Sequence, residues 1–200
     1  KVMAGVEVKF GDYGEILCKG HNVMMGYYNK PELTAEVIDK DGWFHTGDIG
    51  TMVEGVYLKI TDRKKEIFKT SGGKYIAPQV MENKFKESRL IEQIMVLGEG
   101  EKMPSAFIVP DFQALRVWCE HHQIDYTTDA QMTEHPDVLK KYDEEVSHYN
   151  EQFAPYEQLK KFVLMKEAWS VDGGELTATM KLKRKPVLNK FDKEYKEIYS

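Results

Sequence analysis

Short segments of alternating apolar and polar residues, separated by glycine-bounded turns, fill the first sixty residues of this 200-residue sequence. The segments VEVKF and GEILCKG flank the turn GDYG, a pattern typical of a β-hairpin. A second pair, IGTMVEG and VYLKITD, is joined by another glycine turn. Between the pairs, Pro31 begins a helical segment that ends at DKDG. This part of the sequence predicts a β-rich structure built from hairpins.

The pattern changes after Lys65. Strand-like segments (EIFKT, IEQIMVL and SAFIVP) alternate there with amphipathic helical segments (APQVMENKF and FQALRVWCEHHQI). This alternation predicts an α+β fold with a domain boundary at about residues 62–65. We therefore expect a β-rich part at residues 1–62 and an α+β part at residues 63–200. The second part would carry an acidic helical insertion near residues 120–158.

Further expectations concern the core and the tail. Helical and strand spacing predicts that Phe85, Leu90, Ile94 and Val96 are core residues. The tail is predicted to contain a Gly-Gly turn, an extended basic segment and a final amphipathic helix. That helix would place three residues on one face: Phe191, Tyr195 and Ile198.

The net charge of −5 is unevenly distributed. Residues 118–157 hold ten acidic and two basic residues, whereas residues 181–196 hold seven basic and two acidic ones. The negative total argues against a general nucleic-acid-binding protein. The balance of 42% apolar and 30% charged residues is typical of a globular protein. No apolar run approaches the roughly 20 residues that a membrane-spanning helix needs.

The cysteines and histidines predict no metal site. Cys18 and Cys119 lack CxxC spacing, so we expect neither a disulfide framework nor a zinc ribbon, and a cytoplasmic location is the expectation. The histidines of the acidic segment match no helix-face pair or zinc-finger spacing, so we expect them at the surface.

Four short motifs contain residues suited to binding a nucleotide or a thiol. In HTGDIG, Asp48 can accept hydrogen bonds from two neighbouring hydroxyls, although an isolated Asp between glycines is more often a turn residue. In DRKK, Arg63 and Lys65 offer donors to a ribose or phosphate, or form a solvated loop. The pair Gly72–Gly73 is either a plain turn or a path for a narrow ligand. Lys181 is either part of a solvated basic face or a lysine that stabilises a developing negative charge.

These motifs occur in one order: T-G-D, D-R-x-K, a Gly pair followed by KYIAP, and a Lys-rich tail. The order resembles the C-terminal third of the adenylate-forming enzymes, a superfamily of acyl-CoA synthetases, luciferases and peptide-synthetase adenylation domains. The resemblance runs from about Gly5 to Lys185 and is most specific in residues 42–78. Within the superfamily, DRKKEIFKTSGGKYIAPQVME and ELTATMKLKRK look most like the long-chain fatty-acid CoA ligases.

The resemblance implies a two-step reaction of a fatty acid with ATP, accompanied by Mg²⁺, and then with coenzyme A. A carboxylate attacks the α-phosphate of ATP, and the thiol of coenzyme A then displaces AMP from the acyl-adenylate. Residues 1–62 would end the β-rich subdomain of a large domain, and residues 63–200 would form a small C-terminal lid domain. The implied roles are ribose binding for Asp48 and Arg63, the hinge for Lys65, the pantetheine tunnel for Gly72 or Gly73, and catalysis of adenylation for Lys181.

Two features depart from the family pattern. Thr179 and Met180 stand where many relatives have Ser-Gly before the catalytic lysine, which leaves Lys183 as a competitor of Lys181. The Gly pair is one residue longer than in some relatives, which leaves open which glycine meets the pantetheine.

The rotation of a lid domain would reconcile the two chemical steps. An ammonium group that stabilises charge during adenylation would obstruct the thiol afterwards. Turning about a few residues after Arg63 would withdraw Lys181 and present the Gly pair.

The sequence is also compatible with other functions. The KLKRK tail could bind an anionic surface such as nucleic acid or lipid headgroups, and the thiol acceptor could be a carrier protein instead of coenzyme A. The leading hypothesis leaves room for a peripheral membrane contact and expects no nucleic-acid partner. It also assigns the phosphate loop and fatty-acid tunnel to a missing N-terminal domain, so we expect this chain alone to be inactive.

Overall fold

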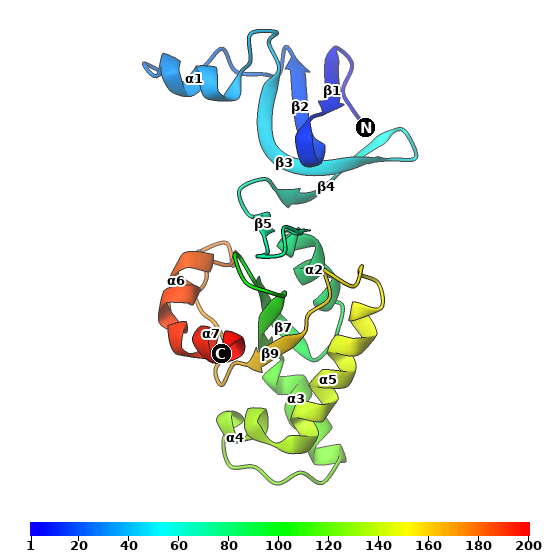
Figure 1. The fold of residues 1–200 in the computed structure, drawn as a ribbon, viewed down its shortest axis with the longest axis vertical. Helices are drawn as coiled ribbons and strands as arrows, with labels where there is room; N and C mark the ends of the chain where they lie inside the picture. The colour runs from blue at the N-terminus through cyan, green and yellow to red at the C-terminus, as the bar shows by residue number, and fades with distance from the viewer. The chain divides into compact units, whose positions relative to one another are not determined.

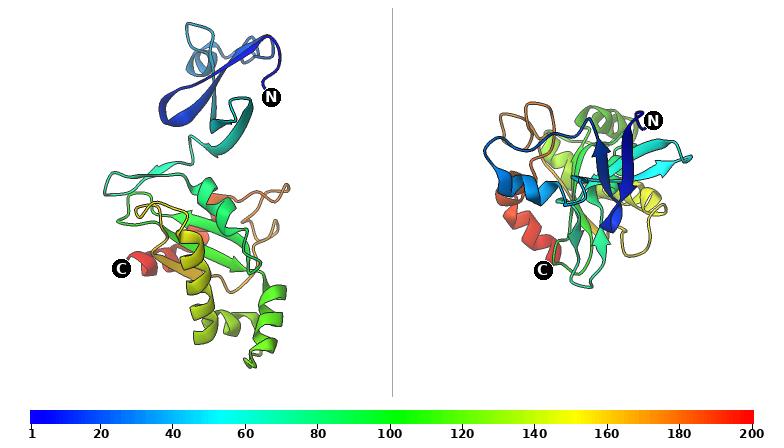
Figure 2. Two further views of the ribbon diagram at one scale, coloured as in Figure 1. Left: turned by 90° about the vertical axis from the view of Figure 1, so that its right-hand side faces the viewer. Right: turned by 90° about the horizontal axis from the view of Figure 1, so that it is seen from above.

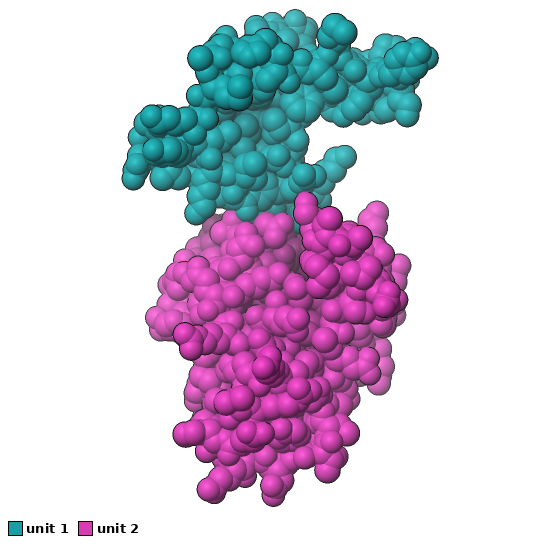
Figure 3. Space-filling view, turned by 180° about the vertical axis from the view of Figure 1, so that it is seen from behind, with its two compact units in different colours: residues 1–67 teal, residues 68–200 magenta.

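The computed structural model describes residues 1–200, which divide into two compact units, residues 1–67 and 68–200 (Figure 3). Each unit has its own β-structure. The division falls after Ile67, in the segment where the sequence pattern changes. The assignment of residues 1–62 and 63–200 to two domains of a larger protein stays a prediction.

Unit 1 is an antiparallel sheet with strand order β1-β2-β3-β4 (Figure 1). The 3-10 helix η1 (Asp12–Gly14) connects the first two strands, and helix α1 (Pro31–Val37) lies between the second and third. Both hairpins predicted from the glycine turns are confirmed. The strands are β1 (Val6–Phe10), β2 (Glu15–Gly20), β3 (Phe44–Val53) and β4 (Tyr57–Arg63).

A close approach of β3 and β4 requires glycine at position 50. The ladder between these strands is irregular between Ile49 and Gly50. A Cβ at Gly50 would lie 2.5 Å from the carbonyl oxygen of Lys59 and 2.7 Å from Cδ1 of Ile16. A ladder carbonyl cannot move aside as a flexible side-chain end can, so only glycine fits. This glycine fixes the spacing of the strands close to Asp48, a candidate site residue.

The apolar core of unit 1 is small. Its buried apolar residues are Ile16, Leu17 and Ile49, and α1 buries none of its own residues. The carboxyl groups of Glu15 and Asp62 belong to buried residues as well. Because so small a core buries little apolar area, polar contacts matter for holding the strand ends in place.

Unit 2 contains a three-stranded sheet with the order β7-β8-β9 and a two-stranded hairpin of β5 and β6. Strands β7 and β8 are antiparallel, whereas β8 and β9 are parallel. Parallel neighbours need a crossover connection, which the chain makes through α3 (Phe112–His121), α4 (Asp129–Glu134) and α5 (Pro136–Asn150). The strands are β5 (Phe68–Lys69), β6 (Tyr75–Ile76), β7 (Ile91–Leu97), β8 (Ser105–Pro110) and β9 (Lys161–Leu164).

Helices cover both faces of the three-stranded sheet. Helices α2 (Pro78–Phe85) and α5 lie on one side, and α6 (Arg184–Lys190) and α7 (Asp192–Tyr199) lie on the other (Figures 1 and 2). None of the helices in the structure combines the length and the apolar character needed to cross a membrane.

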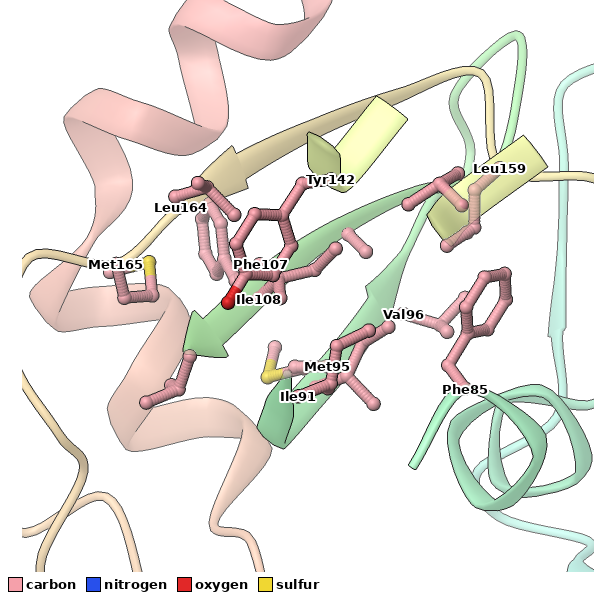
Figure 4. Packing of buried hydrophobic residues seen from close by; sticks show 14 of the residues in the cluster. Phe85, Ile91, Met95, Val96, Phe107, Ile108, Tyr142, Leu159, Leu164 and Met165 are labelled. Carbon is pink, nitrogen blue, oxygen red and sulfur yellow. The ribbon is translucent and has the colours of Figure 1, made fainter. Parts of the chain in front are cut away.

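The core of unit 2 lies between the sheet and the helices, and Figure 4 shows part of it. Phe107 of β8 and Tyr142 of α5 are fully buried. The hydroxyl of Tyr142 donates a hydrogen bond to the carbonyl oxygen of Leu90 at 2.6 Å, so its polar atom is satisfied. The predicted core stripe is confirmed: Phe85, Ile94 and Val96 are buried, and Leu90 packs against the cluster.

The structure corrects one local expectation. The basic tail is not extended throughout, because helix α6 begins at Arg184 and places Val187 in the core. The acidic region is helical, as expected, and α5 buries Val138, Tyr142 and Val146. In both segments, periodic apolar residues determine the structure although charged residues outnumber them.

Candidate functional site

Asp48 and Arg63 face each other across β3 and β4. They occupy paired positions in the ladder, and Nε of Arg63 lies 3.1 Å from Oδ1 of Asp48. The side chain of Asp48 is 25% exposed and that of Arg63 is 67% exposed, so both can reach a ligand at the surface. The backbone N–H of Asp48 donates to Oγ1 of Thr46 at 3.1 Å, and Thr46 in turn donates to the carbonyl of Ile16 at 2.7 Å. Hydrogen bonds of Thr46 therefore hold the T-G-D motif in place within β3.

The chain after Arg63 is anchored to unit 1 through Lys64. The backbone N–H of Lys64 donates to the carbonyl of Gly47 at 2.8 Å, and its Nζ lies 2.7 Å from Oε2 of the buried Glu15. Nδ1 of His45 lies 3.3 Å from the same oxygen. Burial by itself would raise the pKa of Glu15, but the hydrogen bonds and charges of Lys64 and His45 lower it overall. Glu15 is thus a carboxylate anchor for the end of β4.

Lys65 is the first exposed residue beyond this anchor. It lies in a turn in which the N–H groups of Glu66 and Ile67 both donate to the carbonyl of Arg63, at 2.9 and 3.2 Å. Phe68, which follows, belongs to the core of unit 2. The predicted hinge residue therefore lies on the short segment between the last anchor of unit 1 and the first core residue of unit 2.

Gly72 and Gly73 form the exposed turn of the β5–β6 hairpin, and they differ in conformation. Gly73 has φ +78°, in the left-handed region that favours glycine, and its N–H donates to the carbonyl of Thr70 at 2.9 Å. A Cβ at Gly72 would meet only Oγ1 of Thr70, at 4.0 Å. The turn thus needs a glycine at position 73, whereas position 72 faces open space.

Lys181 lies at an exposed turn of the tail. The N–H of Thr177 donates to the carbonyl of Lys181 at 2.8 Å, and the N–H of Lys181 donates to Oγ1 of Thr177 at 3.1 Å. Met180 has φ +59°, which is uncommon for a residue with a side chain. A bridge between Leu176 and Leu182 closes the turn and leaves the ammonium group of Lys181 at the surface.

Two buried carboxylates hold the ends of this tail segment, and no motif in the sequence points to them. Oε1 of Glu82 pairs with Nη2 of Arg184 and accepts the N–H of Val96 at 2.8 Å, while Nη1 of Arg184 donates to the carbonyl of Val96 at 2.9 Å. This cluster joins α2, β7 and the start of α6. Only the tertiary structure brings them together, because Glu82 and Arg184 are 102 positions apart.

Glu175 is the second carboxylate. Its side chain pairs with Nζ of Lys190 and accepts the N–H of Ser170 at 3.1 Å, and its carbonyl accepts the N–H of Lys183 at 2.8 Å. Burial would raise the pKa of Glu175, but the hydrogen bonds from Lys190 and the backbone of Ser170 lower it overall. Lys183 is half-buried, whereas Lys181 is exposed.

The candidate residues fall in both units. Unit 1 brings Asp48 and Arg63 together and places Lys65 directly after them, while unit 2 holds the glycine turn and Lys181. No group of three or more His, Cys, Asp or Glu side chains is arranged to hold a metal ion. The two cysteines are free thiols, and burial raises the pKa of Cys119.

Residues 65–200 match the protein family described as the AMP-binding enzyme C-terminal domain. The matched segment includes the glycine turn, the Lys181 turn and the carboxylates of Glu82 and Glu175 that hold the tail.

Named relatives of the whole chain are longer proteins. The chain is 40% identical over 190 residues to long-chain-fatty-acid–CoA ligase 1 of Homo sapiens, a match that covers 94% of this chain and 27% of that protein. It is 35% identical over 201 residues to long-chain-fatty-acid–CoA ligase FadD15 of Mycobacterium tuberculosis, covering 100% of this chain and 33% of that protein. The chain therefore spans no more than about a third of the length of these relatives.

Solved structures share the fold. The A domain of the carboxylic acid reductase from Segniliparus rugosus, solved with AMP and a co-purified carboxylic acid, matches with a TM-score of 0.70 at 26% identity, over 97% of this chain and 31% of that one. The adenylation domain of the carboxylate reductase from Mycobacterium chelonae matches with a TM-score of 0.72 at 23% identity, over 97% of this chain and 30% of that one. The predicted α+β fold is confirmed. The resemblance to the C-terminal part of adenylate-forming enzymes is confirmed as well, and the chain belongs to the family of AMP-binding enzyme C-terminal domains.

Proposed function

We propose that this chain is the C-terminal part of an ATP-dependent long-chain fatty-acid CoA ligase. In the first step, the carboxylate of the fatty acid attacks the α-phosphate of ATP, which forms the acyl-adenylate and releases pyrophosphate. In the second step, the thiol of coenzyme A attacks the acyl carbonyl and AMP leaves. The observation that carries the proposal is the Asp48–Arg63 pair at 3.1 Å, in a chain 40% identical to a fatty-acid CoA ligase.

Asp48 and Arg63 are the proposed ribose-binding residues. A carboxylate can accept several hydrogen bonds, so Asp48 can bind Arg63 and still accept both ribose hydroxyls. Arg63 holds the Asp48 carboxylate from the neighbouring strand and has further N–H donors for the ribose. Because both residues lie on paired strands, their geometry is set before the nucleotide binds.

Lys65 is the proposed hinge. Lys64 is fixed by Glu15 and by the carbonyl of Gly47, and Phe68 is fixed in the core of unit 2. Rotation is therefore confined to the few residues between them, which is how hinge motions of whole domains occur. Such a rotation would move Lys181 away from the acyl-adenylate and bring the glycine turn towards it, on the microsecond to millisecond timescale typical of these motions.

Lys181 is the proposed catalytic residue for adenylation, in preference to Lys183. Many related enzymes have Ser-Gly before this lysine, and Met180 has φ +59°, a conformation that glycine adopts easily. This supports the alignment of Met180 with that glycine and of Lys181 with the lysine. Lys183 is less suited to reach a substrate, because it is half-buried whereas Lys181 is exposed.

Of the two glycines, Gly72 is the proposed neighbour of the pantetheine. Open space surrounds the position of its absent Cβ, so a thiol arm can pass close to the backbone there. Gly73 has the positive φ that shapes the turn. In the second step, Gly72 would let the thiol arm approach the backbone, and Gly73 would give the turn its conformation.

Mg²⁺ would accompany ATP, but the chain offers no side-chain cluster suited to a metal ion. We therefore assign no Mg²⁺ ligand to these residues.

A cytoplasmic location and a peripheral membrane contact stay predictions. The rival function, an anionic-surface binding module built on KLKRK, is less well supported because Arg184 of this segment already pairs with Glu82.

The test uses the complete enzyme that contains this chain. We expect fatty-acid-dependent exchange of pyrophosphate into ATP, and thioester formation when coenzyme A is added. If the acyl group is transferred only to a carrier-protein pantetheine after adenylation, that alternative acceptor is favoured. If no fatty acid is adenylated, the proposal is contradicted. The 200-residue chain alone should show neither reaction, which makes it a negative control.

A further inference from the structure

The C-terminal helix α7 is attached to the turn between β7 and β8, residues 98–104. The hydroxyl of Tyr195 donates to Oε1 of Glu101 at 3.2 Å, and the hydroxyl of Tyr199 lies 3.4 Å from the carbonyl oxygen of Met103. The two tyrosine rings pack together with centroids 5.0 Å apart. Burial, followed by the charge of Glu101, raises the pKa of Tyr195.

The same turn is attached to the hairpin that carries the glycine pair. The N–H of Ser71 donates to the carbonyl of Glu101 at 2.8 Å, and the N–H of Gly100 donates to the carbonyl of Lys69 at 2.9 Å. Ser71 directly precedes Gly72. The 98–104 turn is therefore bonded on one side to α7 and on the other to the glycine turn.

The glycine end of the hairpin has little other support: Phe68 and Ile76 lie in the core, but residues 71–75 are exposed. Strands β5 and β6 pair at only two positions, Phe68 with Ile76 and Lys69 with Tyr75. An isolated two-stranded hairpin is marginally stable in water even when it is longer. The bonds from the 98–104 turn therefore contribute directly to the position of Gly72 and Gly73.

We propose that Tyr195 and Glu101 are positioning residues for the thiol-transfer step, because they hold the 98–104 turn and, through it, the Gly72–Gly73 turn. This inference rests on the proposed function. The hydrogen bond from Tyr195 to the side chain of Glu101 holds the 98–104 turn. The backbone carbonyl of the same Glu101 accepts the N–H of Ser71. A displacement of the glycine turn would misplace the pantetheine path, and misplacement by about 1 Å can cost up to about a hundredfold in rate.

The central variant is Tyr195→Phe, which removes only the hydroxyl. Its matched control is Tyr142→Phe, which removes another tyrosine hydroxyl of unit 2, bonded to Leu90 and not to the 98–104 turn. We expect faster amide hydrogen exchange in residues 68–76 of Tyr195→Phe than in the unaltered protein or in Tyr142→Phe. We also expect the KM for coenzyme A to rise about threefold to tenfold, with pyrophosphate exchange changed less than about twofold.

A third variant, Glu101→Gln, keeps an acceptor oxygen for Tyr195 and should retain most of the protection of residues 68–76. Unchanged exchange of residues 68–76 in Tyr195→Phe would overturn the proposal, and so would equal acceleration there by Tyr142→Phe. If the unaltered enzyme forms no CoA thioester, the proposed function fails, while the hydrogen-exchange comparison still decides whether Tyr195 and Glu101 position the glycine turn.

Discussion

Asp48 and Arg63 occupy opposite positions of the β3–β4 ladder, and this pairing brings Nε of Arg63 to 3.1 Å from Oδ1 of Asp48. Two motifs that are separate in the sequence thereby become one surface feature. The arrangement leaves a carboxylate that is held in place and still accessible to a ligand, as a ribose-binding group requires.

The first prediction concerns this carboxylate. In the complete enzyme, Asp48→Ala removes the proposed acceptor for both ribose hydroxyls and should weaken ATP binding by about 1.5–3 kcal/mol. The change is measured as the apparent affinity for ATP in pyrophosphate exchange. Asp12→Ala, a substitution in the β1–β2 connection, serves as the control and should have no effect. An unchanged ATP affinity in a folded Asp48→Ala enzyme would mean that Asp48 is only a turn residue.

The second prediction concerns the hinge. Proline at position 65 fixes φ but removes neither the bond from Lys64 to Gly47 nor that from Glu66 to Arg63. Lys65→Pro also restricts the preceding Lys64, so it should stiffen this segment and impair one half-reaction much more than the other. Pyrophosphate exchange and thioester formation from supplied acyl-adenylate are compared, with Lys65→Ala as the flexible control. Equal losses in both half-reactions would argue against a hinge at this residue.

The third prediction separates the two glycines. Gly73→Ala places a Cβ on a residue at φ +78° and should destabilise the hairpin by about 1–2 kcal/mol. Gly72→Ala adds its methyl group to open space, so it should leave stability nearly unchanged and slow only thioester formation. Thermal unfolding and the two half-reactions are measured for both variants. If Gly72→Ala leaves thioester formation unaffected, the pantetheine does not pass beside Gly72.

The fourth prediction identifies the catalytic lysine. Lys181→Ala should slow adenylation by about 10² to 10³, the scale of losing one preorganised electrostatic donor, and should barely change thioester formation. Lys183→Ala is the matched control, two positions away, and should have a small effect. Reversal of the two results would show that Lys183 is the catalytic residue. Small and similar effects at both would indicate a solvated basic tail, because exposed charges are screened.

The fifth prediction is a pH dependence of stability that originates at Glu175. Its pKa in the folded protein is lowered below the ordinary value of 4.5, because the bonds from Lys190 and Ser170 outweigh burial. The folded state therefore binds fewer protons than the unfolded one. This contribution to stability is fully present above about pH 5 and is lost as the pH falls through the folded pKa.

The comparison of Glu175→Gln with the unaltered protein isolates this contribution, because Glu15 and Glu145 also have lowered pKa values. Urea unfolding at about pH 6 should show the variant less stable by about 1–3 kcal/mol. Between about pH 6 and about pH 3, the variant should lose less stability than the unaltered protein. Parallel losses in the two proteins would mean that Glu175 is not a stabilising carboxylate.

Much of the local structure could be predicted because it depends on neighbouring residues. Glycine turns between alternating segments predict the β1–β2 and β3–β4 hairpins, and a proline at the first helical position predicts the starts of α1 and α2. The order of the short motifs also identified the superfamily from residues 42–78. These signals lie within a few positions of one another, so no tertiary information was needed.

The tertiary structure decided which charged residues meet. The basic pattern of the tail describes Arg184 and Lys190 only as cations, but folding places each of them on a buried carboxylate, Glu82 and Glu175. Likewise, the sequence places Glu101 in a plain turn, and only the packing of α7 brings Tyr195 to it. Periodicity and motifs indicate local conformation. A buried charge pair depends instead on how distant segments pack, because both charged groups lose contact with water when they are brought together.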